Sequence, residues 1–147
     1  MSDFSPFEKR LSALIAALSP AGRRRMAQDI AKTLRTRQQK RIKAQKAPDG
    51  SAYTPRREQP ARAKKGRVKR EMFAKLRTNR FMKASGSSDA AVVDFTGKVQ
   101  RIARVHQYGL RDRPSRKGKE VQYEARPLLG INAGDIRLIE SEIIRLL

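Results

Sequence analysis

The single histidine of this chain is the residue best suited to acid–base or metal chemistry. His106 lies in the segment RVHQYGL, between Val105 and Gln107. A hydrolytic triad requires a histidine beside a nucleophile and a carboxylate, and a zinc site of the HExxH type requires two histidines on one helix face. His106 has no such neighbour in the sequence. We therefore predict that it has a packed or hydrogen-bonded structural role.

Other sequence motifs for catalysis or cofactor binding are also absent. The glycines form neither a GxxxxGK[ST] nor a GxGxxG phosphate-binding loop, and there is no cysteine for a disulfide or a thiolate metal site. The acidic residues do not form the carboxylate cluster that a metal-dependent nuclease needs. No apolar run approaches the roughly 20 residues that span a bilayer. We predict a protein that is not an enzyme and has no cofactor, metal, small-molecule ligand or membrane contact.

Positive charge is the strongest compositional signal, and it is unevenly distributed. The chain has 35 Lys and Arg against 14 Asp and Glu, a net charge of +21. Residues 23–70 hold 18 cations and three anions, whereas residues 121–147 hold three cations and four anions. This asymmetry predicts packing elements at the ends and a central surface that faces nucleic acid or an acidic protein. A solvated basic face is the alternative.

Two basic segments have little to bury and hold the candidate contact residues. One is an extended arm, residues 47–68, which begins at the turn PDG with Gly50 at positive φ. The other is a basic loop, residues 111–120. The residues predicted to contact DNA or an acidic partner are Arg56, Arg57, Arg62, Lys64, Lys65, Arg67, Lys69, Arg70, Arg111, Arg113, Arg116, Lys117 and Lys119.

Hydrophobic residues recur at helical spacing near both ends of the chain. Ser5–Pro6 supplies an N-cap and a first-turn proline, and Ser19–Pro20 ends this helix and begins a second one. A C-terminal helix spans residues 132–147, where Asn132 and Asp135 suit a helix start. The apolar faces are formed by Phe7, Leu11, Leu14, Ile15 and Leu18, then Met26, Ile30 and Leu34, and finally Ile136, Ile139, Ile143 and Leu147.

Shorter elements are predicted between these helices. The pattern favours a helix over 68–80, a hairpin of strands at 80–85 and 90–95, a short helix that Gly109 stops in the left-handed conformation, and a strand within 120–131. The result is a single α+β domain, with N- and C-terminal helices packed around a small antiparallel sheet and a long basic arm. The residues assigned to structure or interfaces are His106, Gly109, Ile139 and Ile143.

Four segments, in this order, carry a resemblance to a known family. They are RRRMAQDIAKTLRTRQQKRIKAQKAPDGSAYTPR, GRVKREMFAKLR, RIARVHQYGL and EARPLLGI. With them the chain resembles the phage virion morphogenesis family, and within it the tail completion proteins of contractile-tailed temperate phages. The resemblance extends over nearly the whole chain, from the first helix to the last.

The resemblance implies that residues 1–147 form one tail-completion domain that assembles without catalysing a reaction. Family members are expected to form a sixfold ring at the head-proximal end of the tail, in the neck of the virion, after synthesis in the host cytoplasm. The implied partners are further copies of the chain, a tail tube or terminator protein, a head-completion or neck protein, and genomic DNA in transit. The alternative is a small basic non-specific nucleic-acid-binding or packaging protein, which explains the charge but not the ordered segments.

Overall fold

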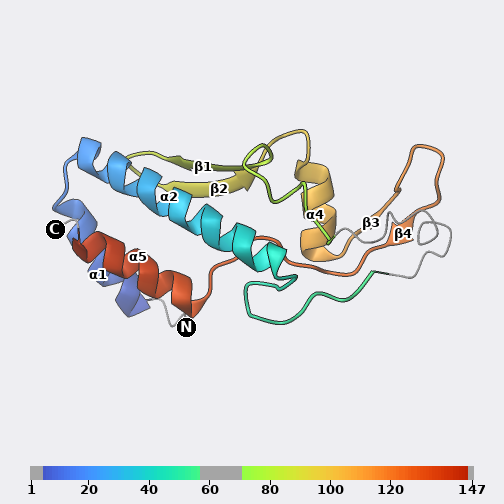
Figure 1. Cartoon of the computed structure of the whole chain (residues 1–147). Helices are drawn as coiled ribbons and strands as arrows, with labels where there is room; N and C mark the ends of the chain where they lie inside the picture. Colours follow the sequence, from blue (N-terminus) through green and yellow to red (C-terminus); the bar gives the residue numbers. More distant parts are fainter. Residues whose placement is uncertain (1–4, 57–70, 146–147) are drawn as a thin grey trace. The chain divides into compact units, whose positions relative to one another are not determined.

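The computed structural model of this chain describes residues 5–56 and 71–145 (Figure 1). In chain order its elements are α1 Ser5–Ala16, α2 Pro20–Lys43, β1 Met82–Gly86, β2 Ala91–Phe95, α4 Gln100–Tyr108, β3 Arg111–Asp112, β4 Val121–Gln122 and α5 Ala133–Arg145. Helices and small sheets are both present, so the predicted α+β class is confirmed. Of the predicted arm, residues 57–68 lie outside the described residues.

The chain divides into two compact units, which are described separately. Unit 1 consists of residues 1–36, 83–94 and 131–147, and unit 2 consists of residues 37–82 and 95–130. Each unit therefore combines segments that are far apart in the sequence.

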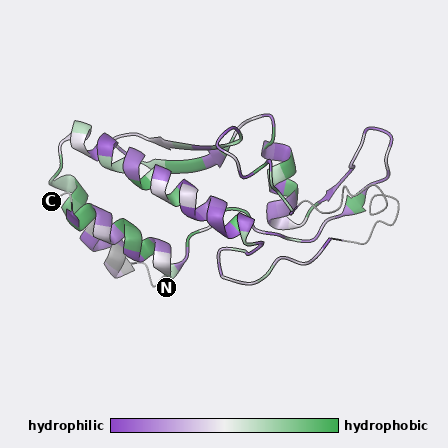
Figure 2. Ribbon diagram, viewed as in Figure 1, coloured by the Kyte–Doolittle hydropathy of each residue, from purple (hydrophilic) through white to green (hydrophobic). Residues whose placement is uncertain are grey.

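Unit 1 has an aliphatic core that α2 and α5 build together. Met26, Ile30 and Leu34 recur every fourth residue along α2 and form a buried cluster with Ile143 of α5. Side chains at the margin of this cluster are half-buried, namely Leu14, Ile15, Leu18, Val93 and Ile139. Figure 2 shows hydrophobic residues distributed along α1 and α5, whereas α2 is largely hydrophilic. The apolar positions predicted for α2 are therefore confirmed as core positions.

The helices of unit 1 begin where the sequence predicts. Ser19 Oγ accepts a hydrogen bond from Gly22 N at 3.1 Å, which satisfies one of the free amides in the first turn of α2. At the start of α5, Asn132 Oδ1 accepts from Asp135 N at 2.9 Å, and Asp135 Oδ2 accepts from Asn132 N at 3.0 Å. This reciprocal pair is a capping box. No helix within the described ranges is both long and apolar enough to cross a membrane.

The predicted hairpin is formed by β1 and β2, which are hydrogen-bonded neighbours. Ser87 N donates to Ala90 O at 2.8 Å and closes the turn. Gly86 at the end of β1 lies directly against α2, because a Cβ at this position would be 2.3 Å from Gln28 N and 2.6 Å from Ala27 C. Only glycine permits so close an approach between two backbones.

The predicted strand over 120–131 is mostly wrong. Only Val121–Gln122 forms a ladder, pairing antiparallel with Arg111–Asp112. From Tyr123 to Gly130 the chain is extended, but side chains, rather than a neighbouring strand, bind much of its backbone. The described residues thus contain two separate two-stranded sheets, β1–β2 and β3–β4, and not one small sheet.

The predicted helix over 68–80 is also wrong in its described part, residues 71–80, which form a series of turns. Phe73 has φ = 65°, a conformation that a right-handed helix does not contain. The side chain of Gln45 holds this segment from the end of α2. Its Oε1 accepts from Met72 N at 3.0 Å, and its Nε2 donates to Met72 O at 2.9 Å.

Candidate functional site

The candidate site begins at the C-terminal end of α4, where Gly109 ends the helix and the chain continues into the basic loop. Gly109 follows α4 with φ = 65° and ψ = 57°, and Leu110 N donates to Val105 O at 2.9 Å. The left-handed conformation predicted for Gly109 is confirmed. A Cβ on Gly109 would also lie 2.7 Å from Ala125 N. Glycine is therefore required here for both its conformation and its small size.

The basic loop connects β3 to β4 within unit 2, and its base is tied down by polar contacts. Gln122 Nε2 donates to Gly109 O at 2.6 Å. Asp112 forms an ion pair with Arg101, and hydrogen bonds from this guanidinium and from the Arg113 backbone lower the pKa of the Asp112 carboxyl. The Asp112 carboxylate at the base of the loop is thus already paired with a cation.

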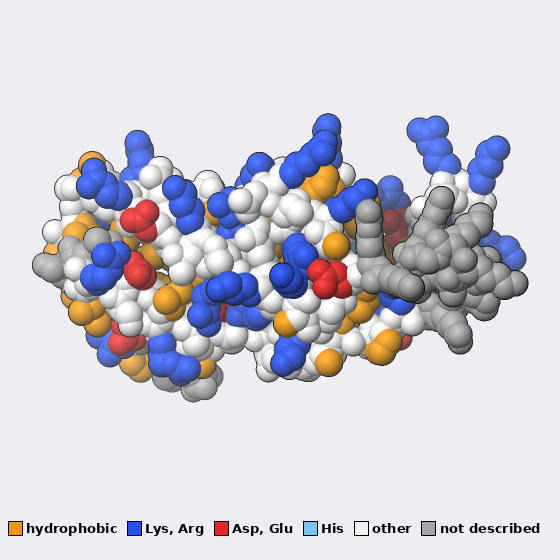
Figure 3. Space-filling view, viewed as in Figure 1, with side chains coloured by type: hydrophobic (Ala, Val, Ile, Leu, Met, Phe, Trp, Pro, Cys, Tyr) orange, Lys and Arg blue, Asp and Glu red, His pale blue; other side chains and the backbone are white. Residues whose placement is uncertain are grey.

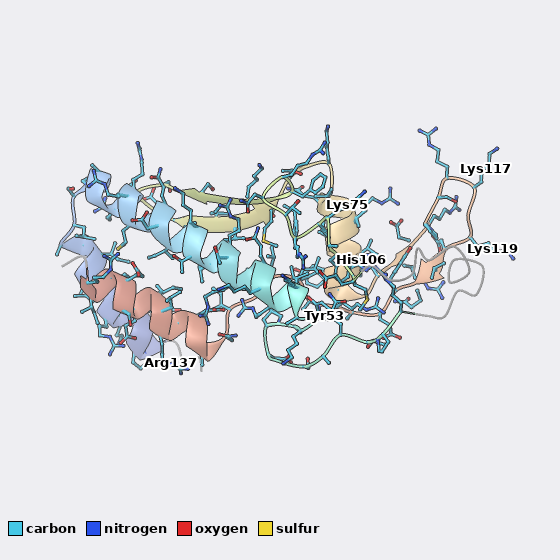
Figure 4. The ribbon with its side chains drawn as sticks, viewed as in Figure 1. Tyr53, Lys75, His106, Lys117, Lys119 and Arg137 are labelled. Atoms are coloured by element: carbon cyan, nitrogen blue, oxygen red, sulfur yellow. The ribbon has the colours of Figure 1, made fainter. Side chains whose placement is uncertain are left out.

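The cations of the loop remain exposed. No described residue forms an ion pair with any of the five Lys and Arg side chains of the loop. Arg111 Nε does donate a hydrogen bond to Gln122 Oε1 at 3.3 Å. Figure 4 places Lys117 and Lys119 at the far end of the loop, away from His106 and Tyr53, and basic side chains project there in the space-filling view (Figure 3). The exposed loop residues are Arg111, Arg113, Arg116, Lys117 and Lys119.

The described start of the arm is held by Arg126, which sequence reasoning missed. Arg126 Nε donates to Thr54 O at 2.7 Å, and Arg126 Nη2 donates to Pro55 O at 3.1 Å. Burial lowers the pKa of Arg126, and the neighbouring cation of Arg56 lowers it further. The contact places Arg56, the first predicted contact residue, directly beside this clamp. The remaining arm candidates, Arg57, Arg62, Lys64, Lys65, Arg67, Lys69 and Arg70, lie outside the described residues.

A second clamp, also missed, is the side-chain amide of Gln107 on α4. Its Oε1 accepts from Leu128 N at 2.8 Å and from Leu129 N at 2.9 Å, while its Nε2 donates to Leu129 O at 2.8 Å. A single amide therefore pairs with the backbone as a neighbouring strand would. Hydrophobic periodicity carries no signal for such a contact, although Gln107 lies in one of the four segments that define the resemblance.

His106 lies in an aromatic cluster and not beside reactive groups. Its ring makes edge contacts with Phe73 and Tyr123, with centroids 5.0 Å apart in each case, and Phe73 contacts Tyr53 at 5.7 Å. Burial, together with the charge of Arg126, lowers the pKa of His106. The His106 Nδ1 atom is buried and has no hydrogen-bond partner among the described residues.

Tyr53 closes the aromatic cluster from the side of the arm. Its hydroxyl donates to Pro127 O at 2.8 Å, and burial raises its pKa to about 12. Ile143 lies instead in the core of unit 1, and the half-buried Ile139 packs against that core. In the described part of the chain, no three His, Asp or Glu side chains are grouped to hold a metal ion.

The comparison with known proteins defines the class of this protein. The model of the phage virion morphogenesis family matches residues 2–147, and the chain belongs to this family. The chain is similar to tail completion protein S of Escherichia phage P2, with 50% identity over 145 residues, which is 98% of this chain and 97% of the relative. The family resemblance seen in the sequence is thereby confirmed. No solved structure matches the chain.

Proposed function

We propose that this protein is a structural, non-enzymatic virion component that completes the phage tail and joins it to the DNA-filled head. The observation that carries the proposal is the 50% identity to a tail completion protein over almost the full length of both chains. The family, described as one of virion morphogenesis, supports the same function. Such a protein acts through its surfaces, and the exposed basic loop of unit 2 is the surface most suited to a partner.

The finer proposal is a sixfold ring at the head-proximal end of the tail, in contact with tail and neck proteins. A closed ring requires each subunit to present two different surfaces. The two units differ in this way, since unit 1 has ten basic and eight acidic residues, whereas unit 2 has 25 basic and six acidic residues. The β3–β4 loop would then face DNA in transit or an acidic partner, because phosphate attraction does not depend on sequence.

The assembly function is tested with tails made in the absence of this protein. Purified protein is added to such tails and to DNA-filled heads, and infectious particles are counted. We expect full joining only when the protein is present, and size-exclusion chromatography with light scattering should detect a sixfold assembly alone or on tails. Unchanged joining without the protein would contradict the proposed function, and a stable monomer on completed tails would contradict the ring.

The basic loop is tested by replacing Arg116, Lys117 and Lys119 together with Gln. Each phosphate contact adds roughly 0.9 to the slope of log affinity against log salt. If the loop faces DNA, the variant should bind duplex DNA with a flatter slope. If it faces an acidic protein, joining should weaken while DNA binding hardly changes. Unfolding should remain near wild type in both cases, because these side chains are exposed.

The matched control replaces Arg24, Arg25 and Lys32 of α2, three exposed cations of unit 1. It removes the same charge from the nearly neutral unit. If the loop variant and this control lose DNA binding and joining to the same extent, only total charge matters. If the loop variant behaves as wild type in both assays, the loop is not part of the site. The same pair of assays applies to Lys64, Lys65 and Arg67 of the arm.

The alternative function, a non-specific nucleic-acid-binding or packaging protein, is favoured by the net charge of +21. Such proteins commonly stack bases on aromatic side chains placed among cations. The aromatic residue of the arm is Tyr53, which is 6% exposed and whose hydroxyl donates to Pro127 O. Tyr53 is therefore unavailable for stacking, so the described part of the arm offers no aromatic side chain in support of this alternative.

A further inference from the structure

An exposed tyrosine lies on the outward face of α4, directly before the basic loop. Tyr108 is 67% exposed, the most exposed of the large hydrophobic side chains described. Arg104 precedes it by four residues and Arg101 by seven, so that all three share one face of the helix. Leu110, which is 36% exposed, follows the helix stop. We name these four residues the α4 face.

Tyr108 has no internal function comparable to that of the other tyrosines. The ring of Tyr123 contacts His106, and the hydroxyl of Tyr53 is bonded within unit 2. Among the described residues, the Tyr108 side chain has neither a ring contact nor a hydrogen bond. Its ring is therefore available to a partner and contributes little to the core.

The composition of the α4 face distinguishes between DNA and protein as its partner. Duplex DNA presents phosphates on its outside, and these gain nothing from the carbon surface of Tyr108 or Leu110. A protein surface offers apolar side chains for the ring and carboxylates for the guanidinium groups. Tyr and Arg are also among the residues most enriched at the centres of protein interfaces.

We propose that the α4 face binds an acidic protein surface that carries apolar side chains, and that this surface belongs to the assembled tail. The proposal rests on the proposed function and names the partner class of its site. Tyr108 inserts its ring among apolar side chains, Arg104 pairs with carboxylates, and the loop cations strengthen long-range attraction to the negative surface.

The test measures binding to tails that were assembled without this protein, and separately to a mixed-sequence DNA duplex. Tyr108→Ala should bind tails about tenfold or more weakly, as expected for an interface centre, with DNA binding within about twofold of wild type. Tyr108→Phe should retain wild-type tail binding, because the proposed contact is made by the ring. Arg104→Gln should weaken tail binding and reduce its salt dependence. The melting temperatures of all three variants should match that of wild type.

Ile102→Ala is the matched control, since Ile102 is 52% exposed on the same helix but on a different side. It should bind tails as wild type does. If the wild-type protein binds tails and Tyr108→Ala binds them equally well, this inference is overturned while the proposed function stays intact. A loss of DNA binding in place of tail binding, or a Tyr108→Phe loss equal to that of Tyr108→Ala, would also overturn it. Wild-type protein that does not bind tails would overturn the proposed function and the inference together.

Discussion

Unit 1 buries Met26, Ile30, Leu34 and Ile143 in one aliphatic core, whereas unit 2 joins its extended segments through polar side chains. In unit 2, Gln107 binds three backbone groups of Leu128 and Leu129, and Arg126 binds two carbonyls at the start of the arm. Apolar residues such as Ile42 and Met82 are buried there as well. Unit 2 thus adds side-chain-to-backbone hydrogen bonds between distant residues. In unit 1 such bonds mostly join residues within five positions of each other, and the exception is Arg23 Nε, which donates to Ser88 O at 3.2 Å.

The two units also differ in charge, and unit 2 is the more basic of the two. Of the 35 basic residues, 25 belong to unit 2. Two-stranded sheets and turns leave many backbone groups without a ladder partner, and buried groups of this kind must be satisfied by side chains. Amide and guanidinium side chains can supply these bonds and remain compatible with a cationic surface. Unit 1 is thus held together by its aliphatic core, whereas polar contacts hold the base of the basic loop and the start of the arm in unit 2.

The largest effect should come from the core of unit 1. Ile143 is 1% exposed, so Ile143→Ala should lower the free energy of unfolding by about 2–5 kcal/mol through lost burial and a cavity. Ile144→Ala is the control, because Ile144 is 55% exposed. Urea denaturation measures both variants. A cost for Ile143→Ala no larger than that for Ile144→Ala would break the comparison, since unit 1 would then not depend on its core.

The next effect should come from the helix stop in unit 2. Gly109→Val places a β-branched residue at φ = 65° and a Cβ 2.7 Å from Ala125 N. The left-handed conformation alone costs roughly 1–2 kcal/mol, and the clash adds to this. Gly97→Ala, where an added Cβ meets no atom within 4 Å, should be close to neutral. A native melting temperature for Gly109→Val would show that the stop is dispensable.

The amide clamp should have an effect of similar or smaller size. Gln107→Ala removes the acceptor of the Leu128 and Leu129 amides, and an unsatisfied buried donor costs about 1–3 kcal/mol. Gln100→Ala removes one exposed amide that donates to Phe95 O at 3.1 Å, and it should cost less than 1 kcal/mol by the same accounting. Amide hydrogen exchange at Leu128 should accelerate only in the Gln107 variant. If the Leu128 amide exchanges equally slowly in both variants, Gln107 does not hold this segment of unit 2.

The smallest effect concerns the pH dependence of His106. Its pKa in the folded protein lies below the ordinary value of 6.5, because burial and Arg126 oppose the charged form. Well above pH 6.5 the ring is neutral in both states. As the pH falls below 6.5, the unfolded chain binds a proton first, so stability decreases until the folded pKa is passed.

His106→Gln does not titrate and should lose less stability between pH 7.5 and pH 5.5 than wild type, when both are measured by urea denaturation. A wild-type pH profile in this variant would show that His106 is not a source of acid sensitivity. Any hydrolytic activity that disappears with His106→Ala would contradict the proposed absence of catalysis.

The elements that the sequence predicted well are those governed by local chemistry. Ser19–Pro20 begins α2, Asn132 and Asp135 begin α5, and Gly109 ends α4, because capping depends on residues within one turn. The turn at Asp49 belongs here too, since Asp49 Oδ1 accepts from Ser51 N at 2.9 Å and Gly50 has φ = 89°. The apolar stripes of α2 and α5 were readable because burial on one side imposes a period of 3.6 residues.

The failures came where distant residues decided the conformation. The helical spacing of Met72, Phe73 and Leu76 is genuine, but Gln45 binds the backbone of Met72, and Phe73 adopts φ = 65° with its ring between those of Tyr53 and His106. Apolar spacing alone cannot distinguish such a set of turns from a helix. Residues 120–131 were predicted to hold a strand, yet only Val121–Gln122 forms a ladder, and side chains bind much of the backbone that follows.

The sequence by itself determined the family, the α+β class, the helix starts and stops, and the uneven distribution of charge, because each depends on composition or on neighbours along the chain. Only the tertiary structure decided which side-chain contacts fix the segments that carry the basic residues. Arg126 holds Thr54 and Pro55, Gln107 holds Leu128 and Leu129, and the exposed ring of Tyr108 faces outward beside the loop. The hydrogen bonds of Arg126 and Gln107 join residues more than 20 positions apart. Each such bond involves a single side chain, so it produces no periodic pattern in the sequence.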